Sequence, residues 1–258
     1  MTIADERRDW FDFGRVIDRA LETCGATLPV GLPAVLLLVV GPELAAYWLA
    51  GAKEPYRRLG EVVDRFDYAA IWGAAVYPIL ISLAAVLCQA MLVQVALAHC
   101  RGRTLGAGEA LVAGLRLLPA AVGIAILTGI GIVLGLLLLI VPGVMLWTIW
   151  VVALPVRADR RMGVIAAIEE SGELTKGVRW QVFGLLIATA LLFGVVTGGL
   201  GLFINALPED WAFLERGVFL PLMSGFGALF TAYGTASLFR DLKWGGQDSD
   251  RELTEVFA

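Results

Sequence analysis

Long stretches without a charged residue constrain this chain more than any other feature of its sequence. Five of them occur, at 23–42, 68–100, 117–156, 180–208 and 217–239. A helix that crosses the hydrocarbon core of a bilayer needs about 20 apolar residues, and charged side chains are costly there. Each stretch is therefore predicted to hold at least one transmembrane helix.

The overall composition excludes most other classes of protein. Hydrophobic residues make up 59% of the 258 residues and charged residues only 17%; the mean hydropathy is +0.79. A soluble domain contains about 25% charged residues, so this chain lacks the polar side chains to cover a water-facing surface. The net charge of −4 and the absence of a basic patch also argue against a nucleic-acid partner.

The longest uncharged stretch is predicted to hold two spans, because one straight helix of that length would be about twice as long as the hydrocarbon core is thick. Pro142-Gly143 is the favoured turn, with Gly129-Ile130-Gly131 as the alternative. The fourth span is then short, and it either crosses the membrane or bends back as a re-entrant segment. The six predicted spans are 26–50, 69–98, 118–141, 143–156, 180–205 and 217–239.

Three segments before the odd-numbered spans are predicted to be amphipathic helices in the membrane plane, at 11–24, 105–117 and 161–177. In the first, one helical face carries Phe13, Val16, Ile17, Ala20, Leu21 and Cys24. The predicted fold is thus an all-α integral membrane protein with six transmembrane helices in three hairpins, each preceded by a cytoplasmic in-plane helix, in a single membrane domain over 1–258. The alternative is that these segments are the ordinary helical ends of long spans.

Basic residues predict the orientation. With the N-terminus inside, 15 of the 20 lysines and arginines fall on the cytoplasmic side. Cytoplasmic segments are enriched in these residues, so both termini are predicted to be cytoplasmic. The basic residues of the first outer loop, Lys53 to Arg65, run against this rule and are interleaved with acids.

Glycine pairs spaced by four residues predict close helix packing, because small side chains let two backbones approach. The sequence contains two such pairs within spans, Gly131 with Gly135 and Gly194 with Gly198.

Polar residues inside the spans are the first candidates for a functional site. Glu43 follows Pro42 in the first span and is compatible with a proton- or cation-coupled site. Alternatively, Pro42 ends the span and leaves Glu43 at the outer headgroups. Gln89, Gln94 and Asn205 can be explained by hydrogen bonds between helices without any substrate.

Motifs for catalysis and metal binding are missing. The sequence has no GxxxxGK[ST], HExxH or GxSxG pattern, and its single histidine lies beside Cys100 without a positioned carboxylate. Cys24, Cys88 and Cys100 form no CxxC pair and are expected to be free thiols. No catalytic residue, cofactor or metal is predicted, and the protein is expected not to be an enzyme.

One part of the chain resembles a known group of proteins. The residues that carry the likeness are Val141-Pro142-Gly143-Val144, Trp147, Ala153-Leu154-Pro155-Val156, Ala167-Ile168-Glu169-Glu170-Ser171, Leu174-Thr175-Lys176-Gly177-Val178-Arg179-Trp180 and Val182-Phe183-Gly184, together with Phe13-Gly14-Arg15-Val16-Ile17. They are similar to six-span bacterial proteins, including the YciC-like inner-membrane proteins and the membrane domain of some glycerophosphodiester phosphodiesterases. The resemblance implies a six-helix protein of the bacterial inner membrane. It implies no phosphodiesterase chemistry, because those enzymes carry their catalytic groups in a separate soluble domain.

Within this region, Lys176, Arg179 and Trp180 form a candidate contact with lipid headgroups, because basic groups attract anionic lipids and tryptophan prefers that depth. The alternative is plain positive-inside anchoring. We expect a non-enzymatic protein of envelope or lipid organisation, or an accessory subunit, whose partners are membrane lipids and other membrane proteins or a second copy. A transporter or channel is the alternative, since interrupted helices can line substrate paths.

Overall fold

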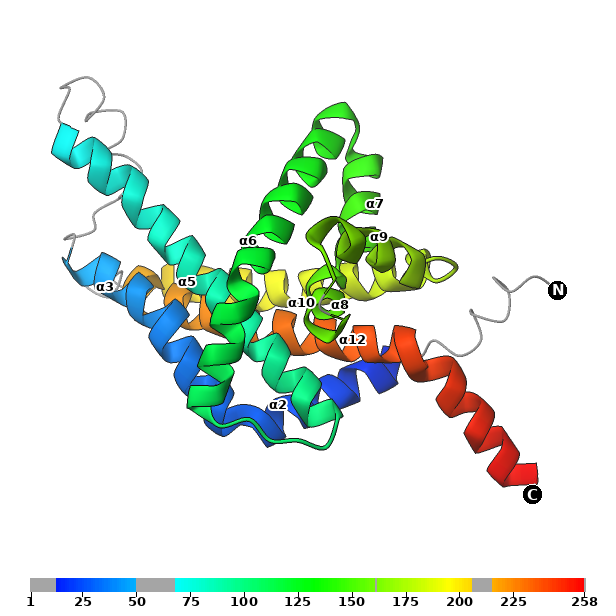
Figure 1. Ribbon diagram of the computed structural model, residues 1–258. Coiled ribbons are helices and arrows are strands. Elements are labelled where there is room, and N and C mark those ends of the chain that lie inside the picture. Colours follow the sequence, from blue (N-terminus) through cyan, green and yellow to red (C-terminus); the bar gives the residue numbers. More distant parts are fainter. Residues whose placement is uncertain (1–12, 50–67, 161, 206–214, 258) are drawn as a thin grey trace.

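The computed structural model describes residues 13–49, 68–160, 162–205 and 215–257, and every regular element in them is helical (Figure 1). The helices, in chain order, are α2 (Phe13–Val35), η1 (Leu36–Val40), α3 (Gly41–Leu49), α5 (Tyr68–Cys100), α6 (Ala107–Leu138), α7 (Ile140–Trp150), α8 (Ala153–Arg160), α9 (Val164–Leu174), α10 (Arg179–Asn205), η3 (Glu215–Phe219) and α12 (Leu220–Phe257).

The chain is an all-α integral membrane protein. Six segments of the described residues are long and apolar enough to cross a membrane: Phe13–Ala45, Val76–Cys100, Ala107–Leu138, Val141–Arg160, Arg179–Phe203 and Gly217–Trp244. Their outer faces are apolar, with 78% of Leu137 and 76% of Leu202 exposed. Side chains of this kind on the outside of a helix suit a lipid environment and would be unfavourable in water.

The first span bends without ending at its prolines. Pro29 and Pro33 lie inside α2, and the π-helical turn η1 ends at Val40, two residues before Pro42. A proline has no N–H to donate to the preceding turn, and a wider π-turn accommodates that loss. The helix then continues as α3, so the prediction that Pro42 ends the span is wrong.

The turn between the third and fourth spans lies at Leu139, earlier than Pro142-Gly143 and later than the alternative at Gly129-Ile130-Gly131. Leu139 has an extended backbone (φ −165°, ψ 145°), and α7 begins at the next residue. Pro142 and Pro155 are each the third residue of their helix, α7 and α8. The first N–H groups of a helix have no intrahelical partner, so proline costs little at these positions. The fourth span is therefore not limited to 143–156: its two helices run over Val141–Arg160, which is long enough to cross.

Two of the three predicted surface helices are continuous with the span that follows them. The segment 11–24 is described from Phe13 on and belongs to α2, and 107–117 forms the start of α6. Only the third segment is a helix of its own, α9, which a turn at 175–178 separates from α10. In that turn Gly177 has a φ of 93°, a left-handed conformation that glycine adopts without strain.

Helices α6 and α7 form a close hairpin that projects from the rest of the molecule (Figure 1). An ideal Cβ on Gly135 would lie 2.8 Å from the Cα of Gly143, so the two backbones touch at this point. The Gly131–Gly135 prediction is thus confirmed. For Gly194 and Gly198 it is not, because no described residue lies within 4 Å of an added Cβ at either position.

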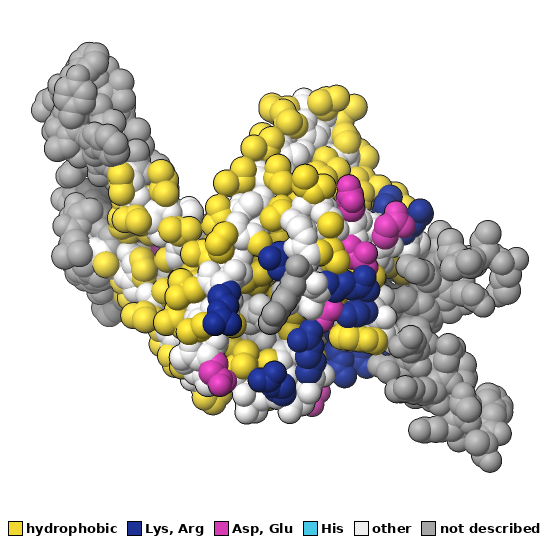
Figure 2. Space-filling view, viewed as in Figure 1, with side chains coloured by type: hydrophobic (Ala, Val, Ile, Leu, Met, Phe, Trp, Pro, Cys, Tyr) yellow, Lys and Arg dark blue, Asp and Glu magenta, His cyan; other side chains and the backbone are white. Residues whose placement is uncertain are grey.

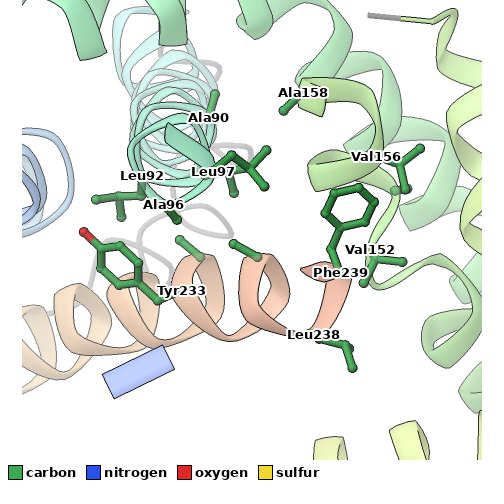
Figure 3. Packing of buried hydrophobic residues seen from close by; sticks show 14 of the residues in the cluster. Ala90, Leu92, Ala96, Leu97, Val152, Val156, Ala158, Tyr233, Leu238 and Phe239 are labelled. Atoms are coloured by element: carbon green, nitrogen blue, oxygen red, sulfur yellow. The ribbon is translucent and has the colours of Figure 1, made fainter. Parts of the chain in front are cut away.

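The buried core lies where α5, α8 and α12 meet. Figure 3 shows Tyr233 of α12 beside Leu92 of α5, and Phe239 of α12 beside Val152 and Val156. All five side chains are at most 1% exposed. This core brings the C-terminal ends of the second, fourth and sixth spans together, and the charged residues near these ends meet there.

Candidate functional site

Basic and acidic side chains gather around one end of the helix bundle, as Figure 2 shows in dark blue and magenta. Four segments contribute them: the start of α2, the end of the second span, the end of α8 with α9, and the later part of α12. In the sequence, an even number of spans separates each of these segments from the next. A chain that crosses the membrane with all six spans must therefore have these four segments on the same side.

Asp241 of α12 is the most deeply buried carboxylate at this end, with none of its side chain exposed. Its Oδ1 lies 3.1 Å from Nη1 of Arg19 and 3.4 Å from Nε of Arg15, both on α2. A buried charge is tolerated only when it is paired and hydrogen-bonded. Two arginines on one helix thus tie the first span to the last.

Asp159 is a second buried carboxylate that joins helices through ion pairs. This carboxylate at the end of α8 pairs with Arg101, which follows α5, and with Lys243 of α12, and its side chain is only 5% exposed. The ammonium group of Lys243 also lies over the rings of Phe239 and Trp244, 5.5 Å and 4.5 Å from their centroids. A cation over an aromatic face gains further stabilisation. One carboxylate therefore connects the second, fourth and sixth spans.

A polar stripe on α12 joins that helix to α2 along several turns. The Tyr233 hydroxyl is hydrogen-bonded to Oγ1 of Thr27 at 2.8 Å, and Ser237 donates to the carbonyl of Val16, also at 2.8 Å. Asp241 follows at the next turn. These three residues of α12 recur every four positions and so share one helical face. That spacing is visible in the sequence, but the uncharged stretches used to predict the spans do not reveal it, because Asp241 lies beyond the last of them.

The residues Lys176, Arg179 and Trp180 lie at the turn between α9 and α10. Trp180 is 71% exposed and meets Phe183 edge to face, with ring centroids 5.9 Å apart. Lys176 pairs with Glu173 at 3.5 Å, but both side chains are more than half exposed. Arg179 donates to the carbonyl of Gly172 at 3.4 Å. Exposed pairs of this kind contribute little, so Lys176 remains accessible to another anion.

Glu43 and Gln89 contact α12 rather than each other. Oε1 of Glu43 accepts a hydrogen bond from Ser224 at 2.7 Å, and Nε2 of Gln89 donates to the carbonyl of Ala228 at 3.1 Å. Neither residue lines the two cavities described below. Asn205 is the last residue of α10, and its side chain is not among those that the structure describes. Both contacts are hydrogen bonds between helices. This was the interpretation given for Gln89, whereas Glu43 was expected either in a proton- or cation-coupled site or at the outer headgroups.

Gln94 differs from the other polar residues of the spans. It lines a cavity of about 260 Å³ at the charged end, together with Arg116 of α6 and Arg157 of α8. Sequence reasoning named Gln94 only as an interhelical donor. The sequence alone did not predict that Gln94 lies next to two arginines, because the three residues belong to three different helices.

The fold and this charged end define a multi-pass, all-α membrane protein whose spans are joined at one end by buried ion pairs. No protein-family model matches the sequence, and neither a curated protein nor a solved structure matches it.

Proposed function

We propose that this protein is a non-enzymatic, multi-pass protein of the bacterial inner membrane that acts in lipid or envelope organisation, or as an accessory subunit. Its contact with anionic lipid headgroups would lie at Lys176, Arg179 and Trp180, at the cytoplasmic ends of the helices. The observation that carries the proposal is the exposure of Trp180 and Lys176 at the start of an apolar span. Tryptophan at the headgroup depth beside a basic group is typical of a lipid contact.

The exposed surface of α10 supports this proposal. Only 6% of the most apolar 18-residue segment of α10 is buried inside the molecule. A span with so little contact to its own chain has most of its surface left for lipid, for another membrane protein or for a second copy. Each of these partners fits a protein that organises the membrane around it.

The orientation is part of the same proposal. The charged end contains arginines or lysines from the segments that precede the first span and follow the second, fourth and sixth. Because basic segments are retained in the cytoplasm, we assign this end, and both termini, to the cytoplasmic side.

Transport is the less supported alternative. Interrupted helices at η1 and between α7 and α8 favour it in principle. However, the two polar residues Glu43 and Gln89, whose side chains could have formed a site within the spans, are engaged with α12.

Native mass spectrometry of the purified protein tests the lipid contact. The double substitution Lys176→Gln with Arg179→Gln should lower the retention of phosphatidylglycerol. Arg240→Gln removes one positive charge from the same end of the bundle and serves as the control. Unchanged retention in the double variant would contradict a headgroup contact at these residues.

A further inference from the structure

Two of the arginines at the charged end line the same cavity and have no carboxylate partner among the described residues. Arg116 and Arg157 line one cavity, and neither forms an ion pair with any carboxylate in the part of the chain that the structure describes. In contrast, Arg15 and Arg19 share Asp241, and Arg101 shares Asp159 with Lys243.

The guanidinium of Arg157 is also incompletely hydrogen-bonded. Its Nε is buried and has no acceptor among the described residues. Buried polar groups are nearly always paired, and a buried cationic donor without an acceptor is more costly than a neutral one. Because Arg157 lines the cavity, an anion bound there would compensate the positive charge of the same guanidinium.

The cavity has the size and lining for such a group. Its volume is about 260 Å³, and its wall consists of Gln94, the two arginines and the apolar side chains Ala113, Leu117 and Ala158. A water molecule accounts for about 30 Å³ of liquid, so the cavity is large enough for a group several times that size. Arginine forks and an amide N–H₂ all donate hydrogen bonds, which matches the oxygens of a phosphate.

A second cavity opens beside the first and shares Ala113 and Arg116 with it. It measures about 420 Å³ and is also lined by Arg103, Leu105, Gly108, Glu109 and Val112. Glu109 is the one carboxylate that faces it, and that side chain accepts a hydrogen bond from the backbone N–H of Gly106 at 3.4 Å. Leu111, Val112 and Leu115 are exposed on the same helix, α6, and lie next to this opening in sequence. Basic and apolar surface are therefore adjacent here.

We infer that the cavity lined by Gln94, Arg116 and Arg157 binds a phosphate-bearing anion. The phosphate lies between the two guanidinium groups and accepts hydrogen bonds from their N–H groups that face the cavity and from the amide of Gln94. A phospholipid headgroup and a free phosphate share this chemistry. The exposed apolar side chains of α6 favour the phospholipid, whose acyl chains could lie against them. This inference deepens the proposed function and rests on it for the lipid as the source, but it concerns residues other than Lys176, Arg179 and Trp180.

Lipid and phosphate binding to the purified full chain test the inference. Native mass spectrometry compares the retention of phosphatidylglycerol with that of phosphatidylcholine, and a titration with inorganic phosphate measures the binding of the free anion. Arg116→Gln and Arg157→Gln should each weaken binding about tenfold, the loss expected for one charge-assisted hydrogen bond. Arg240→Gln, which lies outside both cavities, should leave it unchanged. Arg157→Lys keeps the charge but removes the guanidinium fork, and it replaces Arg157→Gln should that variant fail to fold.

Each outcome decides the matter. Weaker phosphatidylglycerol binding in the Arg116 and Arg157 variants supports the inference with a lipid as the source. Phosphate binding with the same dependence, in the absence of lipid binding, supports it with a free anion as the source. Equal binding in all variants, or binding of neither probe, overturns it. Loss only in the Lys176 and Arg179 double variant overturns this inference and leaves the proposed function standing.

Discussion

The carboxylate of Asp241 on α12 accepts a hydrogen bond from the guanidinium of Arg19 on α2, with 3.1 Å between Oδ1 and Nη1, across a sequence separation of 222 residues. This contact closes the bundle, because it joins the first membrane span to the last. It also explains how the carboxylate of Asp241 can be charged although none of its side chain is exposed.

The first prediction concerns this ion pair. Asp241→Asn should destabilise the protein by about 3 kcal/mol, because it leaves Arg15 and Arg19 without their buried partner. Thermal or denaturant unfolding in detergent measures the difference. The control is Glu169→Gln, an exposed carboxylate on α9, which should change stability by less than about 0.5 kcal/mol. Equal stability of the two variants would show that the ion pair is not needed.

The second prediction compares two glycines from the same kind of motif. Gly135→Ala should destabilise the α6–α7 hairpin by about 1–3 kcal/mol, since the added methyl group would meet the backbone of Gly143 at 2.8 Å. Gly194→Ala should be neutral or slightly stabilising, because nothing lies within 4 Å and alanine is the better helix former. The unfolding midpoints of the two variants test this contrast directly. A loss at Gly194 that matches the loss at Gly135 would point to a partner on α10 that this chain does not supply.

The third prediction uses the free cysteines. Cys88 is fully buried on α5, whereas Cys24 and Cys100 are partly exposed. A maleimide should therefore label Cys24 and Cys100 of the folded protein in detergent, and label Cys88 only after unfolding. In intact spheroplasts an impermeant maleimide should label none of them, because Cys24 and Cys100 are assigned to the cytoplasmic side. Labelling of Cys100 from outside would reverse the proposed orientation.

The fourth prediction tests whether Glu43 is a packing residue. Glu43→Gln and Ser224→Ala should each cost little, and a double-mutant cycle should give a coupling of about 0.6 kcal/mol, as for hydrogen bonds between membrane helices. Unfolding of the two single variants and the double variant supplies the cycle. Ser82→Ala, on the second span, is a control that should show no coupling to Glu43. A coupling of zero between Glu43 and Ser224 would free Glu43 for another role and would strengthen the transport alternative.

Much of the architecture could be predicted because it depends on local composition. An uncharged stretch of about 20 residues favours a membrane helix wherever it occurs, so the six spans and the all-α class follow from the gaps between charges. The span boundaries were less predictable. Considered alone, Pro142 predicts a turn. At the third position of a helix, however, a proline loses no hydrogen bond, and the turn lies at Leu139 instead.

The sequence by itself therefore determined that this chain enters a membrane, how many times it can cross, and where its charges are concentrated. Only the tertiary structure decided which charges meet. Asp241 with Arg19, and Asp159 with Arg101 and Lys243, lie on different helices, and their distances depend on how those helices rotate and pack. The same holds for Gln94, Arg116 and Arg157, which surround one cavity although no local pattern connects them. The physical reason is that hydropathy acts within a segment, whereas ion pairing and cavity formation act between segments.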